Sequence, residues 1–211
     1  MAWTLNDFKT RPERLTHKLQ IAIRGFQQNN APYNENVVVG GDTYSIADFG
    51  RNATGTVQIA PMTVPNELHA TGTRDNGGNA YLLPWSTNSL CLAELGQAHD
   101  FFFTPTVTGC AIIVSGGLCN PFVIHANSKS TRLDSVVTMD DTIAKYREIY
   151  GEMTASMSGK GMVDPANVQV FQPGDYISKG TVFGVRKAGA WAFYATAWDA
   201  KGATTKKLWP K

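Results

Sequence analysis

Cys110 and His125 are the two residues of this sequence whose types and spacing could support covalent chemistry. A thiol beside an imidazole can share a proton with it, and the imidazole can then stabilise a thiolate at neutral pH. A free thiol, with a pKa of about 8.5, is mostly protonated there. Gly109 lets a substrate carbonyl approach the backbone, so main-chain N–H groups at Thr108 and Gly109 could form an oxyanion hole. These features indicate an acyl-transfer reaction.

The stretch between these two residues is typical of a β-hairpin. Two apolar runs, residues 111–114 and 122–124, enclose a turn-forming segment, Ser115-Gly116-Gly117-Leu118-Cys119-Asn120-Pro121. A hairpin centred between residues 117 and 118 would place Cys110 directly opposite His125. Directly opposed residues have Cβ atoms about 5 Å apart and side chains on the same face.

Structural roles for the same residues are the alternative interpretation. Free cysteine often packs as a small hydrophobe, and His125 follows apolar residues that are typical of a core. Cys91 and Cys119 have no histidine at a comparable register, so we interpret both as structural.

The remaining histidines and motifs add no second site. His17 is expected on the polar side of a helix, His69 in a strand and His99 at the surface or behind the site. The sequence contains no HExxH, GxSxG or phosphate-binding glycine motif, and its three cysteines lack zinc-site spacing. We therefore expect neither a metal nor a cofactor.

Length and composition indicate one globular domain over residues 1–211. Hydrophobic residues make up 43% and charged residues 17%, and the net charge of +2 gives no basic stripe for nucleic acid. The first eighteen residues contain no secretory h-region, and no apolar run reaches membrane-spanning length. We expect a monomer that works in a reduced, cytosolic compartment, without direct binding to nucleic acid or membrane.

Hydrophobic periodicity predicts two helices among many strands. One helix is expected near residues 11–28, and another from the Thr138 cap to Gly151. Residues 36–86 are typical of β-sheet with glycine turns. Further strands are predicted at Val168–Phe171, Thr181–Arg186 and Trp191–Trp198. The fold class is therefore α+β, a mostly antiparallel β-sandwich or mixed sheet with a few flanking helices.

Four short motifs in one order resemble the Burkholderia lethal factor family of glutamine deamidase toxins, related to the catalytic domain of cytotoxic necrotizing factor. They are Leu83-Pro84-Trp85, Phe102-Phe103-Thr104, Thr108-Gly109-Cys110, and His125 after a glycine-rich turn. The resemblance covers about residues 81–128. Two departures are Thr108 in place of the family's serine and a Cys-to-His interval that is longer than in the lethal factor by three residues.

The resemblance implies that Cys110 and His125 are catalytic and that Thr104 completes the site by orienting the imidazole through its carbonyl or hydroxyl. It implies a bacterial virulence toxin, a hydrolase without cofactor that converts a glutamine of a host protein to glutamate. Its substrate would be a translation-initiation RNA helicase, with a Rho-type GTPase as the less favoured choice. It would be made in the bacterial cytoplasm and act in the host cytosol. A protease, a transglutaminase or a non-catalytic β-sandwich binding module are the alternatives.

Overall fold

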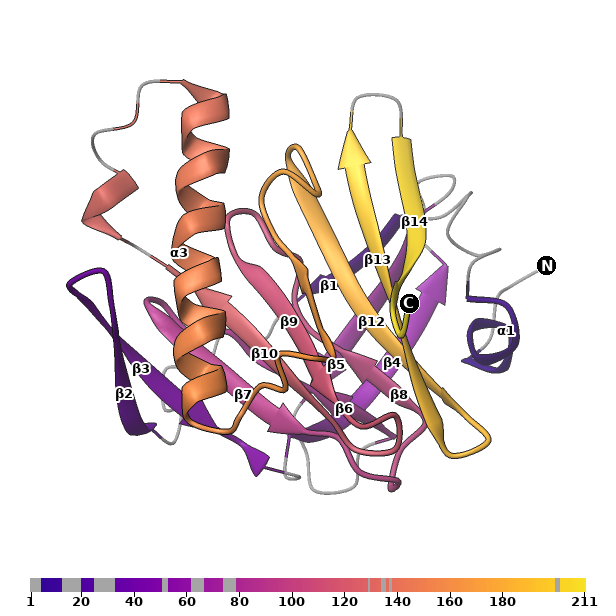
Figure 1. Cartoon of the computed structure of the whole chain (residues 1–211). Helices are drawn as coiled ribbons and strands as arrows, with labels where there is room; N and C mark the ends of the chain where they lie inside the picture. The colour runs from indigo at the N-terminus through magenta and orange to yellow at the C-terminus, as the bar shows by residue number, and fades with distance from the viewer. Residues whose placement is uncertain are drawn as a thin grey trace.

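Two β-sheets pack face to face, and one long helix covers the outer face of the smaller sheet (Figure 1). The computed structural model describes residues 5–12, 20–24, 33–50, 53–61, 67–73, 79–128, 130–133, 136, 138–199 and 202–211. Neighbouring strands are mostly antiparallel, and three pairs are parallel. The predicted α+β fold, a mostly antiparallel sandwich with few helices, is confirmed.

Among the described residues the larger sheet has eight strands, and the first and last strands of the chain, β1 and β14, form its two edges. Its strand order is β1 (Gln20–Arg24), β5 (Glu67–Thr73), β4 (Thr54–Pro61), β6 (Ala80–Leu82), β8 (Phe101–Phe103), β12 (Lys179–Lys187), β13 (Ala190–Asp199) and β14 (Gly202–Trp209). β1 pairs with β5 and β6 with β8 in parallel. The predicted strands 181–186 and 191–198 are confirmed as β12 and β13, each somewhat longer than expected.

Among the described residues the smaller sheet has six strands, and the predicted hairpin supplies its second and third strands. Its order is β11 (Val168–Phe171), β9 (Ala111–Gly116), β10 (Pro121–Asn127), β7 (Ser89–Glu94), β3 (Asp42–Asp48) and β2 (Tyr33–Val39). The helical elements are α1 (Leu5–Thr10), the 3-10 turn η2 (Thr131–Leu133) and α3 (Met139–Gly159). β9 and β10 therefore lie between β11 and β7, with both of their edges paired.

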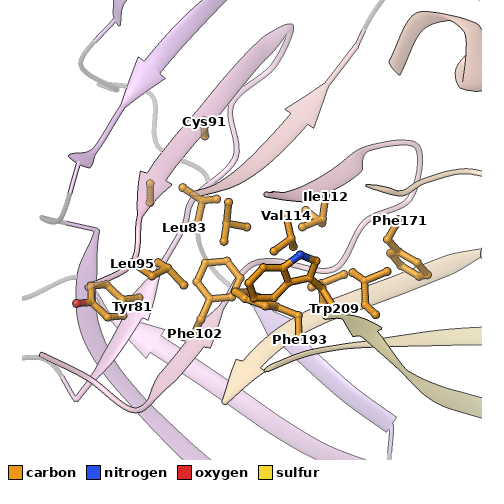
Figure 2. Packing of buried hydrophobic residues seen from close by; sticks show 14 of the residues in the cluster. Tyr81, Leu83, Cys91, Leu95, Phe102, Ile112, Val114, Phe171, Phe193 and Trp209 are labelled. Carbon is orange, nitrogen blue, oxygen red and sulfur yellow. The ribbon is translucent and has the colours of Figure 1, made fainter. Parts of the chain in front are cut away.

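Two apolar layers explain why the strands of the hairpin are apolar on both faces. Successive residues of a strand point to opposite faces. Ile112 and Val114 of β9 point into the core between the two sheets, and Ala111 and Ile113 point into the layer beneath α3. Figure 2 shows the inter-sheet core, where the Phe193 ring packs edge-on against the rings of Phe102 and Trp209.

The helix α3 begins where the sequence predicts and ends later. Thr138 caps it by accepting a hydrogen bond from the Asp141 N–H at 3.1 Å. The helix continues past Gly151 to Gly159 because Met153 and Met157 extend its buried stripe. The predicted stop at Gly151 is wrong, since the packing of that stripe outweighs the weak helix propensity of one glycine.

The predicted first helix at residues 11–28 is contradicted. α1 ends at Thr10, and Gln20–Arg24 forms β1, which pairs in parallel with β5. In the run Gln-Ile-Ala-Ile-Arg the two isoleucines are two positions apart, a spacing that also fits a strand. Pairing with β5 selects the strand over the helix. Residues 13–19 and 25–32 are outside the described part of the chain, as is His17. His69 lies in a strand, β5, as predicted.

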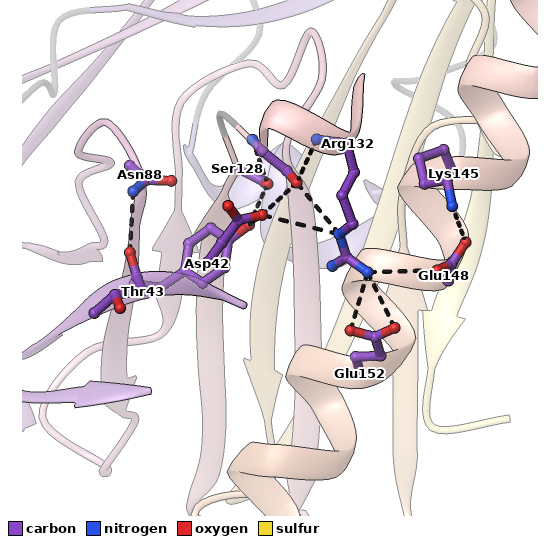
Figure 3. A network of polar contacts seen from close by, with 10 residues as sticks. Asp42, Thr43, Asn88, Ser128, Arg132, Lys145, Glu148 and Glu152 are labelled. Carbon is purple, nitrogen blue, oxygen red and sulfur yellow. Dashed lines mark hydrogen bonds and ion pairs between the residues drawn. The ribbon is translucent and has the colours of Figure 1, made fainter. Parts of the chain in front are cut away.

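A polar network fixes α3 against the segment that leaves β10 (Figure 3). The Arg132 guanidinium bonds the Glu152 carboxylate at 3.1 and 3.2 Å and the Glu148 carboxylate at 3.4 Å. Its Nε lies 3.9 Å from the Asp42 carboxylate at the start of β3. The network therefore joins η2, α3 and β3, and it holds α3 over the end of the hairpin.

Among the helices that the structure describes, none is long and apolar enough to cross a membrane.

Candidate active site

The hairpin register differs from the predicted one by two residues. Ala111 pairs with Ala126 and Ile112 with His125, so the turn is centred between residues 118 and 119. Continuing this register places Cys110 opposite Asn127. The predicted direct opposition of Cys110 and His125 is therefore wrong. The ladder closes at Gly116 and Pro121, which leaves a four-residue turn.

Cys110 and His125 nevertheless lie on the same face of the sheet. A shift of two residues keeps the side-chain alternation, so the pair become diagonal neighbours with Cβ atoms about 7 Å apart. Cys110 packs against the inter-sheet core, and His125 is 1% exposed beside it on the same face. The predicted same-side relation holds, with Cys110 at the end of the strand and His125 one pair deeper.

Cys91 is the cysteine that lies directly opposite His125, across the pair of β7 and β10. The prediction that no histidine shares its register is wrong. Its side chain is fully buried in the inter-sheet core, as the structural interpretation of this residue requires. Cys119 is exposed in the hairpin turn. Burial therefore separates Cys91, which a substrate cannot reach, from the partly exposed Cys110.

The imidazole of His125 is held by Thr104, which follows β8 in the opposite sheet. The Thr104 hydroxyl lies 2.7 Å from His125 Nδ1, and both residues are buried. Of the two groups that the resemblance implied for this threonine, carbonyl or hydroxyl, the hydroxyl makes the contact with the imidazole. Burial lowers the pKa of His125 to about 3, so the imidazole is neutral at physiological pH.

The other ring nitrogen of His125 is the available base. His125 Nε2 is buried and has no hydrogen-bond partner among the described residues. The predicted proton-sharing contact with Cys110 is accordingly not formed in this arrangement. If Nδ1 donates to Thr104, Nε2 carries the lone pair that can accept a proton.

The sulfur of Cys110 accepts hydrogen bonds from donors other than His125. Asn127 Nδ2 donates to Cys110 Sγ at 3.1 Å, and a hydrogen bond from the Thr108 backbone also favours the thiolate. Burial outweighs both and raises the pKa of Cys110 to about 11. The predicted thiolate at neutral pH is therefore wrong for this resting arrangement, because the same burial keeps both the thiol and the imidazole uncharged.

Two tyrosines, Tyr150 of α3 and Tyr176 of the loop before β12, form a clamp on the backbone at Gly109 and Cys110. The Tyr176 hydroxyl donates to the Cys110 carbonyl at 2.6 Å and accepts from the Gly109 N–H at 3.0 Å. The Tyr150 hydroxyl donates to the Gly109 carbonyl at 2.6 Å. This tyrosine clamp fixes the main chain at the sulfur. It also occupies the Gly109 N–H that was predicted as an oxyanion donor.

Gly109 is required by its surroundings. Its φ is +148°, a conformation that L side chains rarely adopt, and a Cβ here would lie 3.1 Å from the Tyr146 hydroxyl. Val107, two residues before Gly109, forms two backbone hydrogen bonds with Gly180 of β12, at 2.8 and 2.9 Å. The loop that carries Thr108 to Cys110 is thus fixed by β12 of the larger sheet, by Tyr176 and by α3.

His99 takes no part in this cluster. Its ring packs edge-on against Tyr81 with centroids 5.0 Å apart, and burial lowers its pKa. In the part of the chain that the structure describes, no three His, Cys, Asp or Glu side chains are placed to hold a metal ion.

Sequence reasoning missed Asn127, Tyr150 and Tyr176. Asn127 could have been found, because a residue two positions after His125 shares its sheet face. No protein-family model matches the chain, and no curated protein matches it. The site's chemistry therefore rests on its own geometry: a partly exposed thiol with two hydrogen-bond donors, and a buried neutral imidazole on the same face.

Proposed function

We propose that this chain is a protein glutamine deamidase, a hydrolase that attacks the side-chain carboxamide of a glutamine through Cys110. The observation that carries the proposal is the buried, neutral imidazole of His125, oriented by Thr104 at Nδ1 and without a partner at Nε2. It lies on the same sheet face as the thiol. Its Nε2 lone pair accepts the thiol proton as negative charge develops on the attacking sulfur, because a neighbouring negative charge raises the pKa of an imidazole.

The mechanism starts from the neutral pair. On substrate binding the Cys110 side chain turns from Asn127 toward His125, which is within reach for diagonal neighbours. The thiol proton passes to His125 Nε2 as the sulfur attacks the carboxamide carbon. The imidazolium then gives a proton to the departing ammonia, and the neutral imidazole activates water to hydrolyse the thioester. Glutamine becomes glutamate.

The substrate class comes from the resemblance of residues 81–128 to the lethal factor family. By that resemblance we propose a host protein as substrate, with a translation-initiation RNA helicase favoured over a Rho-type GTPase. The chain would then be a bacterial toxin that acts in the host cytosol and inhibits translation. The tyrosine clamp supports a rigid presentation of the nucleophile, which a reaction on a folded protein surface needs.

The decisive experiment compares Cys110→Ser with Cys119→Ser. Each variant is incubated with the purified helicase and with a Rho-type GTPase, and substrate mass and released ammonia are measured. We expect the wild type and Cys119→Ser to raise the substrate mass by about one dalton with equimolar ammonia, and Cys110→Ser to do neither. Activity retained in Cys110→Ser would remove this residue from the mechanism.

The same experiment separates the alternatives. Cleaved peptide bonds would indicate a protease, and incorporation of an added primary amine would indicate a transglutaminase. The raised pKa of Cys110 also agrees with a non-catalytic module in which the thiol only packs. That reading predicts no product of any kind and an unchanged substrate mass.

A further inference from the structure

Asn127 is fixed at both ends of its amide. Its Oδ1 accepts a hydrogen bond from the Asn88 N–H at 3.2 Å, and its Nδ2 donates to Cys110 Sγ at 3.1 Å. Because Oδ1 faces a donor, the amide orientation is determined by the network. Asn88 is itself held, since its own Nδ2 bonds the Thr43 carbonyl at 3.1 Å (Figure 3). The Asn127 donor is therefore preorganised toward the sulfur.

Asn127, the donor at the sulfur, and His125, the proposed base, lie at different depths in the sheet. Asn127 and Cys110 are both partly exposed and face each other at the end of the hairpin, where a substrate can reach them. His125 lies one pair deeper and is buried. A carboxamide entering from the solvent side thus meets the Asn127 amide together with the sulfur, while the base acts from behind.

The backbone donor expected at Gly109 is already used by the Tyr176 hydroxyl. A tetrahedral intermediate carries its oxyanion on the carbon that is bonded to the sulfur. When the sulfur turns toward His125, it frees the donor that it bonded at rest, and that donor then lies close to the oxyanion. Asn127 Nδ2 is such a donor, together with the Thr108 backbone group that also bonds the sulfur. Asparagine amides are known to serve as oxyanion donors.

We propose that Asn127 is a catalytic residue of the deamidation, whose Nδ2–H donates first to the Cys110 sulfur and then to the oxyanion of the tetrahedral intermediate. The inference rests on the proposed function. In the step, the sulfur–carbon bond forms, the C=O π electrons move to oxygen, and the thiol proton goes to His125 Nε2. The oxyanion then re-forms the carbonyl, the carbon–nitrogen bond breaks, and ammonia leaves with the proton from His125. Asn127 donates only a hydrogen bond throughout.

The test compares Asn127→Ala and Asn127→Asp with a matched control, Asn120→Ala, at the turn of the same hairpin. Asn120 contacts the Glu94 side chain at 3.4 Å and lies at the opposite end of β10 from Cys110. Ammonia release is measured on the protein that the wild type converts, either the helicase or the GTPase. We expect kcat to fall about 10²-fold to 10³-fold in both Asn127 variants with a small change in KM, and Asn120→Ala to keep the wild-type rate.

A second readout needs no substrate. The rate of Cys110 alkylation by iodoacetamide is followed against pH in a Cys91→Ala, Cys119→Ser background whose folding is checked by thermal unfolding. We expect the midpoint to move to higher pH in Asn127→Ala, and further in Asn127→Asp, where a carboxylate faces the sulfur. A purely structural role for Asn127 would not produce this order.

The outcomes separate the inference from the function on which it rests. A wild type that releases no ammonia from either protein overturns the deamidase and the oxyanion role together. An active wild type whose kcat is unchanged in Asn127→Ala, or falls equally in Asn120→Ala, overturns the role of Asn127 alone. An alkylation midpoint that does not move in Asn127→Ala overturns the contribution of its hydrogen bond to the sulfur.

Discussion

Replacing Tyr176 with phenylalanine removes one oxygen that bonds two backbone groups. The hydroxyl donates to the Cys110 carbonyl and accepts from the Gly109 N–H, whereas the ring packs against Phe171 with centroids 5.2 Å apart. Phenylalanine keeps the ring packing, so the substitution isolates the hydrogen bonds. Each bond contributes about 1 kcal/mol, and we expect Tyr176→Phe to lower the free energy of unfolding by about 2 kcal/mol.

Urea unfolding followed by tryptophan fluorescence measures this loss as a lower midpoint at an unchanged m-value. Tyr146→Phe is the matched control: its hydroxyl lies beside Gly109, but within the described residues it bonds neither of the clamped backbone groups, so we expect a change below about 0.5 kcal/mol. Cys110 should also be alkylated faster in Tyr176→Phe, because its main chain is less restrained. Equal losses in the two variants, or a loss below about 0.5 kcal/mol in Tyr176→Phe, would refute the clamp.

Three further predictions concern the groups around the sulfur. Thr104→Val leaves His125 Nδ1 buried without its partner, so we expect about 1 to 3 kcal/mol less stability in urea and a lower kcat for ammonia release. The pKa of His125 is lowered to about 3, so its contribution to stability is complete above about pH 6.5 and is lost as the pH falls toward 3. Urea unfolding should show a loss of about 2 kcal/mol at pH 5 relative to pH 7.5 that is absent in His125→Gln. Gly109→Ala forces a side chain into a left-handed φ beside Tyr146, and thermal unfolding should show about 1 to 3 kcal/mol less stability than in Gly117→Ala, where a Cβ meets open space.

Local patterns predicted the hairpin, the cap of α3 and the late strands because each is determined by neighbouring residues. Thr138 and Asp141 are three positions apart, and the strand Val168–Phe171 agrees with its prediction at both ends. The segment Gln20–Arg24 failed because its short apolar run fits both periods, and only pairing with β5 selects the strand.

The candidate site was predicted in composition but not in detail. Thr104 contacts His125 as the resemblance implied, and Cys110 shares a sheet face with His125 without the predicted contact. The turn sequence allows more than one register, and the closure at Gly116 and Pro121 decides it. The tyrosine clamp could not be predicted, since Tyr150 and Tyr176 are 41 and 66 residues from the backbone groups that they bind. The raised pKa of Cys110 and the lowered pKa of His125 depend on burial, which only the packing of both sheets determines.

The shift of two residues in the hairpin register determines which side chain faces the Cys110 sulfur and how deeply His125 is buried. Direct opposition would have let the imidazole share the thiol proton and stabilise a thiolate. The observed register instead places an amide donor opposite the sulfur and moves His125 deeper into the sheet, where burial keeps it neutral. With its pKa lowered to about 3, the neutral imidazole is a weak base in the resting site, and a thiol that remains protonated is protected from stray oxidation and alkylation. In the proposed deamidation, this pair becomes reactive when a bound carboxamide excludes water and its oxygen takes up the developing charge. By this proposal reactivity is coupled to substrate binding, and the charge forms on the oxygen that we infer to face Asn127.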